Sequence, residues 1–118
     1  MSEEAYASMV HALSAVGLTA QRHGPDQLIV STQEGPVWPN RGNSFWLSFQ
    51  GGRWLLSTWL PACYRIPPGQ DVVALCSACM QSGTAMYKVP EEIARRFALE
   101  RISNDEFDRL FPEHDDER

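Results

Sequence analysis

The chain has 118 residues, of which 43% are hydrophobic and 21% are charged, and its formal net charge is −5. This composition is typical of a soluble globular protein and excludes the collagen-like and disordered classes. A chain of this length suits one folding unit. We therefore expect a single domain over residues 1–111 and a mobile acidic tail over residues 112–118, whose side chains are too polar to pack.

The sequence carries no sign of a membrane segment or a disulfide framework. Its first residues, Met1 to Glu4, are acidic where a signal peptide would be basic, and no apolar run approaches the ~18 residues that a membrane span needs. Three cysteines are too sparse, and odd in number, for the disulfide scaffold of a small secreted protein. We expect a cytoplasmic protein with reduced thiols and no membrane partner.

Charge is distributed unevenly along the chain. Residues 1–34 hold four acids and one Arg, residues 35–90 hold four cations and one Asp, and residues 91–118 hold ten acids and five Arg. Only the middle segment is therefore net positive. Because its cations are scattered rather than concentrated, we expect no nucleic-acid partner.

The first predicted element is an amphipathic helix from Glu3 to Val16. Its apolar residues recur at helical spacing, and Gly17 is a natural stop. These residues are Tyr6, Met9, Val10, Leu13 and Val16. His11 falls on the solvent side of this helix, so we do not expect it to be a buried ligand.

The next predicted elements are a strand and a long loop. The β-branched run from Gln27 to Thr32 is predicted as the first strand of the sheet. The stretch from Gln33 to Asn43 contains two Pro and two Gly and is predicted as a loop.

Two apolar runs joined by Gly51-Gly52 predict a β-hairpin with a two-residue turn. This turn places Gln50 opposite Arg53. The core face of the hairpin is the one that carries most of its large apolar groups, namely Phe45, Leu47, Phe49, Trp54 and Leu56. Trp46 and Trp59 lie on the opposite face, near the end away from the turn.

Helices are predicted to follow the hairpin. After a Pro-rich connection, Pro61 to Gly69, an amphipathic helix covers residues 70–82. Pro90 suits the first position of a second helix, and Ser103 with Glu106 forms a capping box for a third. The apolar residues of the first and third of these helices are Val72, Val73, Leu75, Cys76, Cys79, Met80, Phe107, Leu110 and Phe111.

This order of elements predicts an α+β fold. It consists of an N-terminal helix, an antiparallel sheet of three or four strands that contains the Gly51-Gly52 hairpin, and two or three helices packed on the sheet. Residues 86–89 are the candidate for a fourth strand.

The sharpest chemical motif is Cys76-Ser-Ala-Cys79, a spacing found in thiol redox sites and in halves of zinc sites. A redox pair needs a thiol at a helix N-terminus, whereas Cys76 lies about two turns inside its predicted helix. No second metal-binding pair with suitable spacing is present. We favour buried core cysteines, and a thiol or zinc site built on Cys63, Cys76 and Cys79 is the alternative.

No arrangement typical of an enzyme is visible in the sequence. His11 faces solvent, His23 precedes a turn and His114 is in the tail, so no histidine is placed beside a nucleophile. No Gly-rich phosphate loop follows a strand. We expect a non-catalytic protein without a cofactor.

Aromatic and arginine side chains gather at the end of the predicted hairpin away from its turn. This predicted cluster comprises Trp38, Arg41, Trp46, Trp59, Tyr64 and Arg65. All six come from the net-positive segment, and their types are enriched at binding hot spots. Either a second layer covers the two central indoles, or the cluster is exposed and binds a partner.

We accordingly expect a small binding module that recognises a protein partner through this cluster, and an acidic partner would suit the positive segment. The sequence leaves open whether the chain also forms homo-oligomers.

Overall fold

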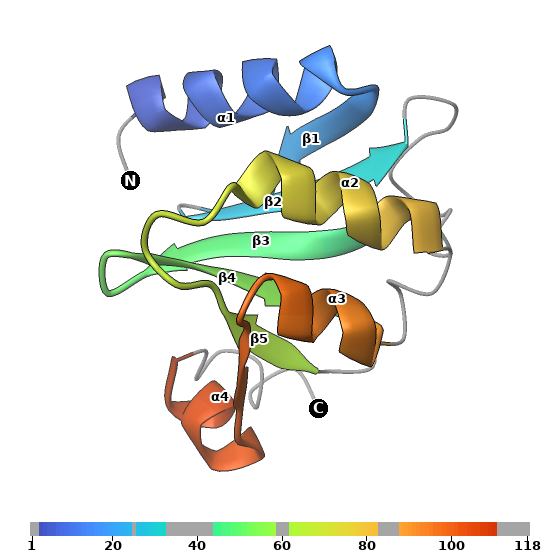
Figure 1. Ribbon diagram of the computed structural model, residues 1–118. Helices are drawn as coiled ribbons and strands as arrows, with labels where there is room; N and C mark the ends of the chain where they lie inside the picture. Colours follow the sequence, from blue (N-terminus) through green and yellow to red (C-terminus); the bar gives the residue numbers. More distant parts are fainter. Residues whose placement is uncertain (1–2, 25, 33–43, 59–61, 83–87, 111–118) are drawn as a thin grey trace.

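The computed structural model of the chain describes residues 3–24, 26–32, 44–58, 62–82 and 88–110. Figure 1 shows one sheet with α2 and α3 in front of it, α1 beside β1 and α4 at the lower end. None of the helices in these ranges is both long enough and apolar enough to cross a membrane. In chain order the elements are α1 (Glu3–Ala15), β1 (Leu18–Arg22), β2 (Gln27–Thr32), β3 (Ser44–Gln50), β4 (Arg53–Ser57), β5 (Cys63–Arg65), α2 (Val72–Ser82), α3 (Glu91–Arg96), β6 (Glu100–Ile102) and α4 (Asn104–Leu110).

The six strands form one antiparallel sheet in the order β1-β2-β3-β4-β5-β6. The predicted α+β fold is confirmed, with a helix before the sheet and helices after its first five strands. The prediction of three or four strands is wrong, because it omitted β1, β5 and β6. Part of the candidate strand at residues 86–89 lies outside the described residues.

The hairpin of β3 and β4 has the predicted register, with Gln50 opposite Arg53. Gly51 and Gly52 have φ angles of +60° and +78°, in the left-handed region that a tight hairpin turn of this kind requires. Because the turn fixes the register, it also fixes which side chains of both strands face the core.

The helices α1, α2 and α3 pack on one side of the sheet, which we call the first face. Leu13 of α1, Leu75 of α2 and Ile93 of α3 meet Phe45 and Leu47 of β3 in this main core. The core face that the hairpin register predicts is therefore confirmed for Phe45, Leu47, Trp54 and Leu56, whereas Phe49 is partly buried and contacts Trp54.

The end of α1 differs from the prediction. The helix stops at Ala15, and Gly17 has a φ of +85°, which turns the chain into β1. Val16 lies between them and is 47% exposed rather than packed on the apolar stripe.

The other side of the sheet, which we call the second face, is partly covered by α4. Phe107 and Leu110 of this helix pack against Leu55, Cys63 and Ile102, which form a second, smaller core. The hydroxyl of Ser103 accepts a hydrogen bond from the backbone N–H of Glu106 at 3.2 Å, as the predicted capping box requires.

Candidate functional site

Trp46 is the described indole of the predicted cluster, and it lies on the second face of the sheet. It pairs with Ile29 of β2 on one side and with Ser57 of β4 on the other. Its side chain is partly buried. The ring of His23 meets it edge-on, with the ring centroids 4.7 Å apart and the planes at 82°. Trp46 is thus anchored on a strand but keeps some of its surface in contact with solvent.

Arg65 lies on the same face as Trp46, but it serves a contact within the chain. Its guanidinium donates to the carboxylates of Glu106 at 2.6 Å and Glu100 at 3.0 Å. The bond to Glu106, and then the bond to Glu100, raises the pKa of Arg65 above its ordinary value. Arg65 therefore joins α4 to β5 and β6, and much of its charge is already compensated.

Tyr64 is directed away from both of these residues. It lies in the main core on the first face, where it is 7% exposed, and the guanidinium of Arg101 sits over its ring at 5.6 Å. Successive strand residues point to opposite faces, so Tyr64 and Arg65 cannot share one surface. Trp38, Arg41 and Trp59 lie outside the described residues.

The structure therefore does not gather the three described members of the cluster. Trp46 on β3 and Arg65 on β5 are two strands apart, a separation of about 10 Å across the sheet. The small core beneath α4 lies beside Arg65. Of these three residues, Trp46 is partly buried, Arg65 has a 20% exposed side chain and Tyr64 is 7% exposed.

The three cysteines are free and buried, but they are not together. Cys76 and Cys79 lie in the main core on the first face, while Cys63 lies in the second core on the other side of the sheet. Burial raises the pKa of Cys79 to about 12 and that of Cys76 well above its ordinary value. These thiols are protonated at neutral pH, unlike a reactive or metal-binding thiolate.

The structure therefore does not bring Cys63 together with Cys76 and Cys79. Burial also raises the pKa of Cys63, and its sulfur accepts a hydrogen bond from the hydroxyl of Ser57 at 3.2 Å. Across the described residues, no group of three or more His, Cys, Asp or Glu side chains is placed to hold a metal ion.

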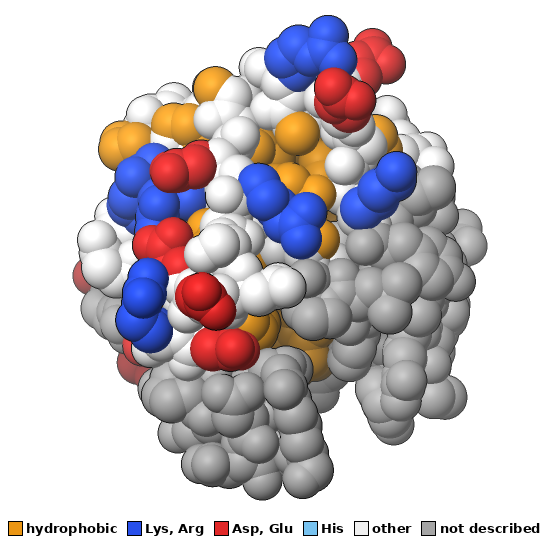
Figure 2. All heavy atoms as spheres, turned by 90° about the horizontal axis from the view of Figure 1, so that it is seen from below, with side chains coloured by type: hydrophobic (Ala, Val, Ile, Leu, Met, Phe, Trp, Pro, Cys, Tyr) orange, Lys and Arg blue, Asp and Glu red, His pale blue; other side chains and the backbone are white. Residues whose placement is uncertain are grey.

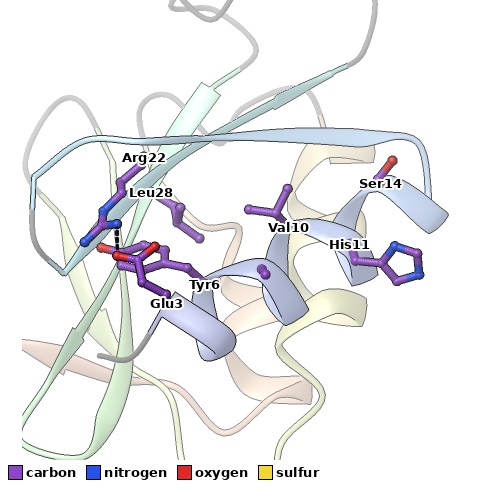
Figure 3. A pocket seen from close by; sticks show the side chains of 8 residues that line it. Glu3, Tyr6, Val10, His11, Ser14, Arg22 and Leu28 are labelled. Carbon is purple, nitrogen blue, oxygen red and sulfur yellow. Dashed lines mark hydrogen bonds and ion pairs between the residues drawn. The ribbon is translucent and has the colours of Figure 1, made fainter.

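An open groove runs between α1 and β1, on the first face of the sheet (Figure 3). Its volume is about 490 Å³. Arg22 of β1 and Leu28 of β2 line one side. The residues of α1 that line the other side are Glu3, Tyr6, Ala7, Val10, His11 and Ser14.

One end of this groove is fixed by a set of polar contacts. The guanidinium of Arg22 lies over the Tyr6 ring, 4.2 Å from its centroid, and forms an ion pair with Glu3. The hydrogen bond to Glu3 raises the pKa of Arg22. The Tyr6 hydroxyl lies 3.3 Å from the carbonyl oxygen of Gly24. This site is not predicted from the sequence because β1 carries no clear strand pattern, although Arg22 stands out as the one cation of residues 1–34.

Among the described residues of the second face, two polar side-chain atoms are buried without a hydrogen-bond partner, the hydroxyl oxygen of Ser48 and Nε of Arg53. Ser48 is 1% exposed. The two residues are diagonal neighbours on β3 and β4, because Gln50 is the residue opposite Arg53.

Charged side chains of both signs are mixed at the end of the molecule that carries α4. Figure 2 shows Lys and Arg interleaved with Asp and Glu around apolar groups on this side. The described residues therefore form no continuous surface of one sign here. Comparison with protein-family models, with curated proteins and with solved structures finds no match for this chain.

Proposed function

We propose that the chain is a non-catalytic domain that binds another protein through the second face of the sheet around Trp46. The observation that carries this proposal is the position of Trp46, an indole held on a central strand, off the main core and partly exposed. A large aromatic group with a polar N–H on a rigid support is the kind of side chain that dominates binding energy at protein interfaces.

The rest of the predicted cluster belongs to the proposal only in part. Trp38, Arg41 and Trp59 remain candidates for the same surface, because the sequence connects them to the end of the hairpin where Trp46 lies. Arg65 contributes less charge than expected, since Glu100 and Glu106 pair with it. An acidic partner is still favoured by the net charge of residues 35–90. The free thiols suit a reducing compartment, so we include a cytoplasmic location in the proposal.

The test compares two tryptophans of the same hairpin. Trp46 lies on the second face, whereas Trp54 is also partly buried but packs against the main core. Immobilised wild type, Trp46→Ala and Trp54→Ala are each exposed to a native cell extract, and captured proteins are quantified by mass spectrometry. We expect Trp46→Ala to lose proteins that wild type and Trp54→Ala both retain.

Urea denaturation of the same variants separates binding from folding. Trp54→Ala is expected to lower the free energy of unfolding more than Trp46→Ala does. A loss of about 3–5 kcal/mol for Trp46→Ala, the cost of a buried aromatic, would assign Trp46 to the core and end the proposal. Unchanged capture by a folded Trp46→Ala variant would end it as well.

A further inference from the structure

The edge of the sheet at β1 is open. β1 is the outermost strand, and β2 is its only neighbour in the sheet of the described residues. The N–H of His23 donates to the carbonyl of Gln27 at 2.9 Å. This bond determines which residues of β1 direct their backbone N–H and C=O groups toward β2 and which direct them away. Residues 21 and 19 then bond toward β2, and the intervening residues direct their N–H and C=O groups outward. These outward residues are Leu18, Ala20 and Arg22.

The opposite edge differs in ways that discourage pairing. β6 has three residues, and two of them, Glu100 and Arg101, are charged. The Glu100 carboxylate also accepts a hydrogen bond from Arg65. Short, charged edges are common protection against strand addition. β1 has five residues without Pro and with one charge, Arg22, which is drawn back over Tyr6.

The open edge and the α1–β1 groove lie side by side. The side chains of Ala20 and Arg22 lie on the first face, as does the groove, which Arg22 itself lines. A strand added about 4.8 Å beyond β1 would send every second side chain toward this face. There it would meet Ala7, Val10 and Ser14, which line the groove and are small or apolar. Figure 3 shows Val10 and Ser14 on α1.

We propose that the β1 edge and this groove bind an extended segment of a partner protein, which adds to the sheet as a further strand. Alternate apolar side chains of the segment fill the groove, and a basic side chain lies near Glu3 and Glu4. Both carboxylates are on exposed residues at the start of α1, and residues 1–34 hold four acids against one Arg. This site lies on another surface from Trp46 and does not rest on the function proposed for it.

Charge favours a partner segment over a second copy of this chain. If two β1 strands paired antiparallel about Ala20, Leu18 of one copy would lie beside Arg22 of the other. The one cation of β1 already pairs with Glu3, so a second copy brings no free cation in β1 for Glu3 and Glu4.

The probe is a blocked heptapeptide, Thr-Val-Thr-Val-Thr-Lys-Thr, whose two Val side chains and one Lys side chain share one face when it is extended. Nuclear magnetic resonance titration of the intact protein is expected to shift the amide signals of Leu18, Ala20 and Arg22. The same peptide with N-methylated Val residues should not bind, because it lacks donors for the edge. Absence of shifts at millimolar peptide, or shifts centred elsewhere, would overturn the proposal.

Two pairs of variants locate the site. Ala20→Pro removes an outward N–H, which an edge strand tolerates, and should weaken peptide binding at least tenfold, whereas Ala20→Thr keeps the N–H and should not. Should Ala20→Pro fail to fold, the second pair decides. Ala7 and Ser8 are both exposed, but Ala7 lines the groove and Ser8 does not. Ala7→Arg should weaken binding at least tenfold and Ser8→Arg less than twofold.

Equal effects of Ala7→Arg and Ser8→Arg would refute the groove as the site. Sedimentation of the peptide-free protein tests the other occupant. A concentration-dependent dimer that Ala20→Pro abolishes would show that the edge pairs with a second copy, contrary to the proposal. Trp46→Ala is expected to leave peptide binding unchanged, so this site and the Trp46 surface can fail independently.

Discussion

Ser48 and Ser57 are both buried on the second face but differ in their hydrogen bonds. The Ser48 hydroxyl has no partner, whereas the Ser57 hydroxyl donates to Cys63. A buried hydroxyl without a partner has lost its hydrogen bonds to water and gained none in the protein, which destabilises the fold. Ser48→Ala is therefore expected to raise the free energy of unfolding by about 1 kcal/mol. Ser57→Ala is expected to lower it by a similar amount. Urea denaturation of both variants measures the difference.

The contrary result for Ser48 would also be informative. Ser48 on β3 and Arg53 on β4, whose Nε also lacks a hydrogen-bond partner, are diagonal neighbours. If Ser48→Ala destabilises the protein, a water molecule joins these two groups in solution, as buried waters commonly do. Arg53→Gln would then destabilise it too.

Ala98 is the described non-glycine residue with a positive φ, at +56°. It follows α3, where its N–H donates to the carbonyl of Arg95. This left-handed conformation costs an alanine about 1 kcal/mol, so Ala98→Gly is expected to be neutral or to raise the midpoint of thermal unfolding. Ala94→Gly within α3 should cost about 1 kcal/mol instead. A lower midpoint for Ala98→Gly would mean that its methyl group packs.

At the scale of elements, α4 is attached to the sheet by one small core and one arginine. Arg65 has a 20% exposed side chain, so its pairs with Glu100 and Glu106 are better shielded than a typical surface pair. Arg65→Gln is expected to cost about 1 kcal/mol or less and to speed hydrogen exchange in α4 before the central strands.

Arg95 of α3 provides the matched control for Arg65. Its pair with Glu91 is 3.4 Å long and joins side chains that are 75% and 90% exposed, so Arg95→Gln should change neither stability nor exchange measurably. If Arg65→Gln slows or leaves unchanged the exchange of Phe107 and Leu110 amides, the arginine is not what holds α4.

For the whole molecule, the buried thiols predict a loss of stability in alkali. In the unfolded chain a cysteine ionises near pH 8.5, whereas in the folded protein the pKa of Cys79 is about 12 and that of Cys76 is also raised. Above about pH 8.5 the thiols of Cys76 and Cys79 therefore keep their protons in the folded protein but release them in the unfolded chain. The stability conferred by these thiols is complete below that pH and declines as pH rises toward 12.

The variant Cys76→Ala with Cys79→Ala tests this linkage. At pH 7 it should lose about 1–3 kcal/mol through lost packing. Its free energy of unfolding, measured by urea titration at several pH values, should then fall less steeply between pH 9 and 11 than that of wild type. Parallel pH curves would show that the thiols do not contribute.

Much of the fold could be predicted from local sequence patterns. The hairpin turn is determined by Gly51-Gly52, and α2 by an apolar stripe that includes Cys76. The edge strands carry weaker signals. In β1 the first-face residues are Leu18, Ala20 and Arg22, so small and charged groups obscure the alternation. Strands β5 and β6 have three residues each and are stabilised by pairing with distant neighbours.

The short strands also limit how much of the candidate site the sequence can predict. Tyr64 and Arg65 point to opposite faces because they are consecutive residues of β5. When β5 is not predicted, the sequence gives no reason to place these two side chains on different surfaces. The acids that pair with Arg65 come from residues 100 and 106, a distance along the chain that no local pattern spans. The groove forms only where β1 lies beside α1. Because the sequence does not predict β1, it does not predict the groove.

The sheet order also has a consequence for how the chain folds. Strands β2 to β5 each pair with the strand that precedes them in the chain, so these contacts close short loops. The partner of Cys63 in β6 is Ile102, and α2 and α3 intervene. Closing this longer loop costs more chain entropy. The contacts of β6 that offset this cost can form only after the earlier strands are in place. We therefore expect the C-terminal strand and α4 to be the last part of the described fold to assemble during refolding and the first to separate during unfolding.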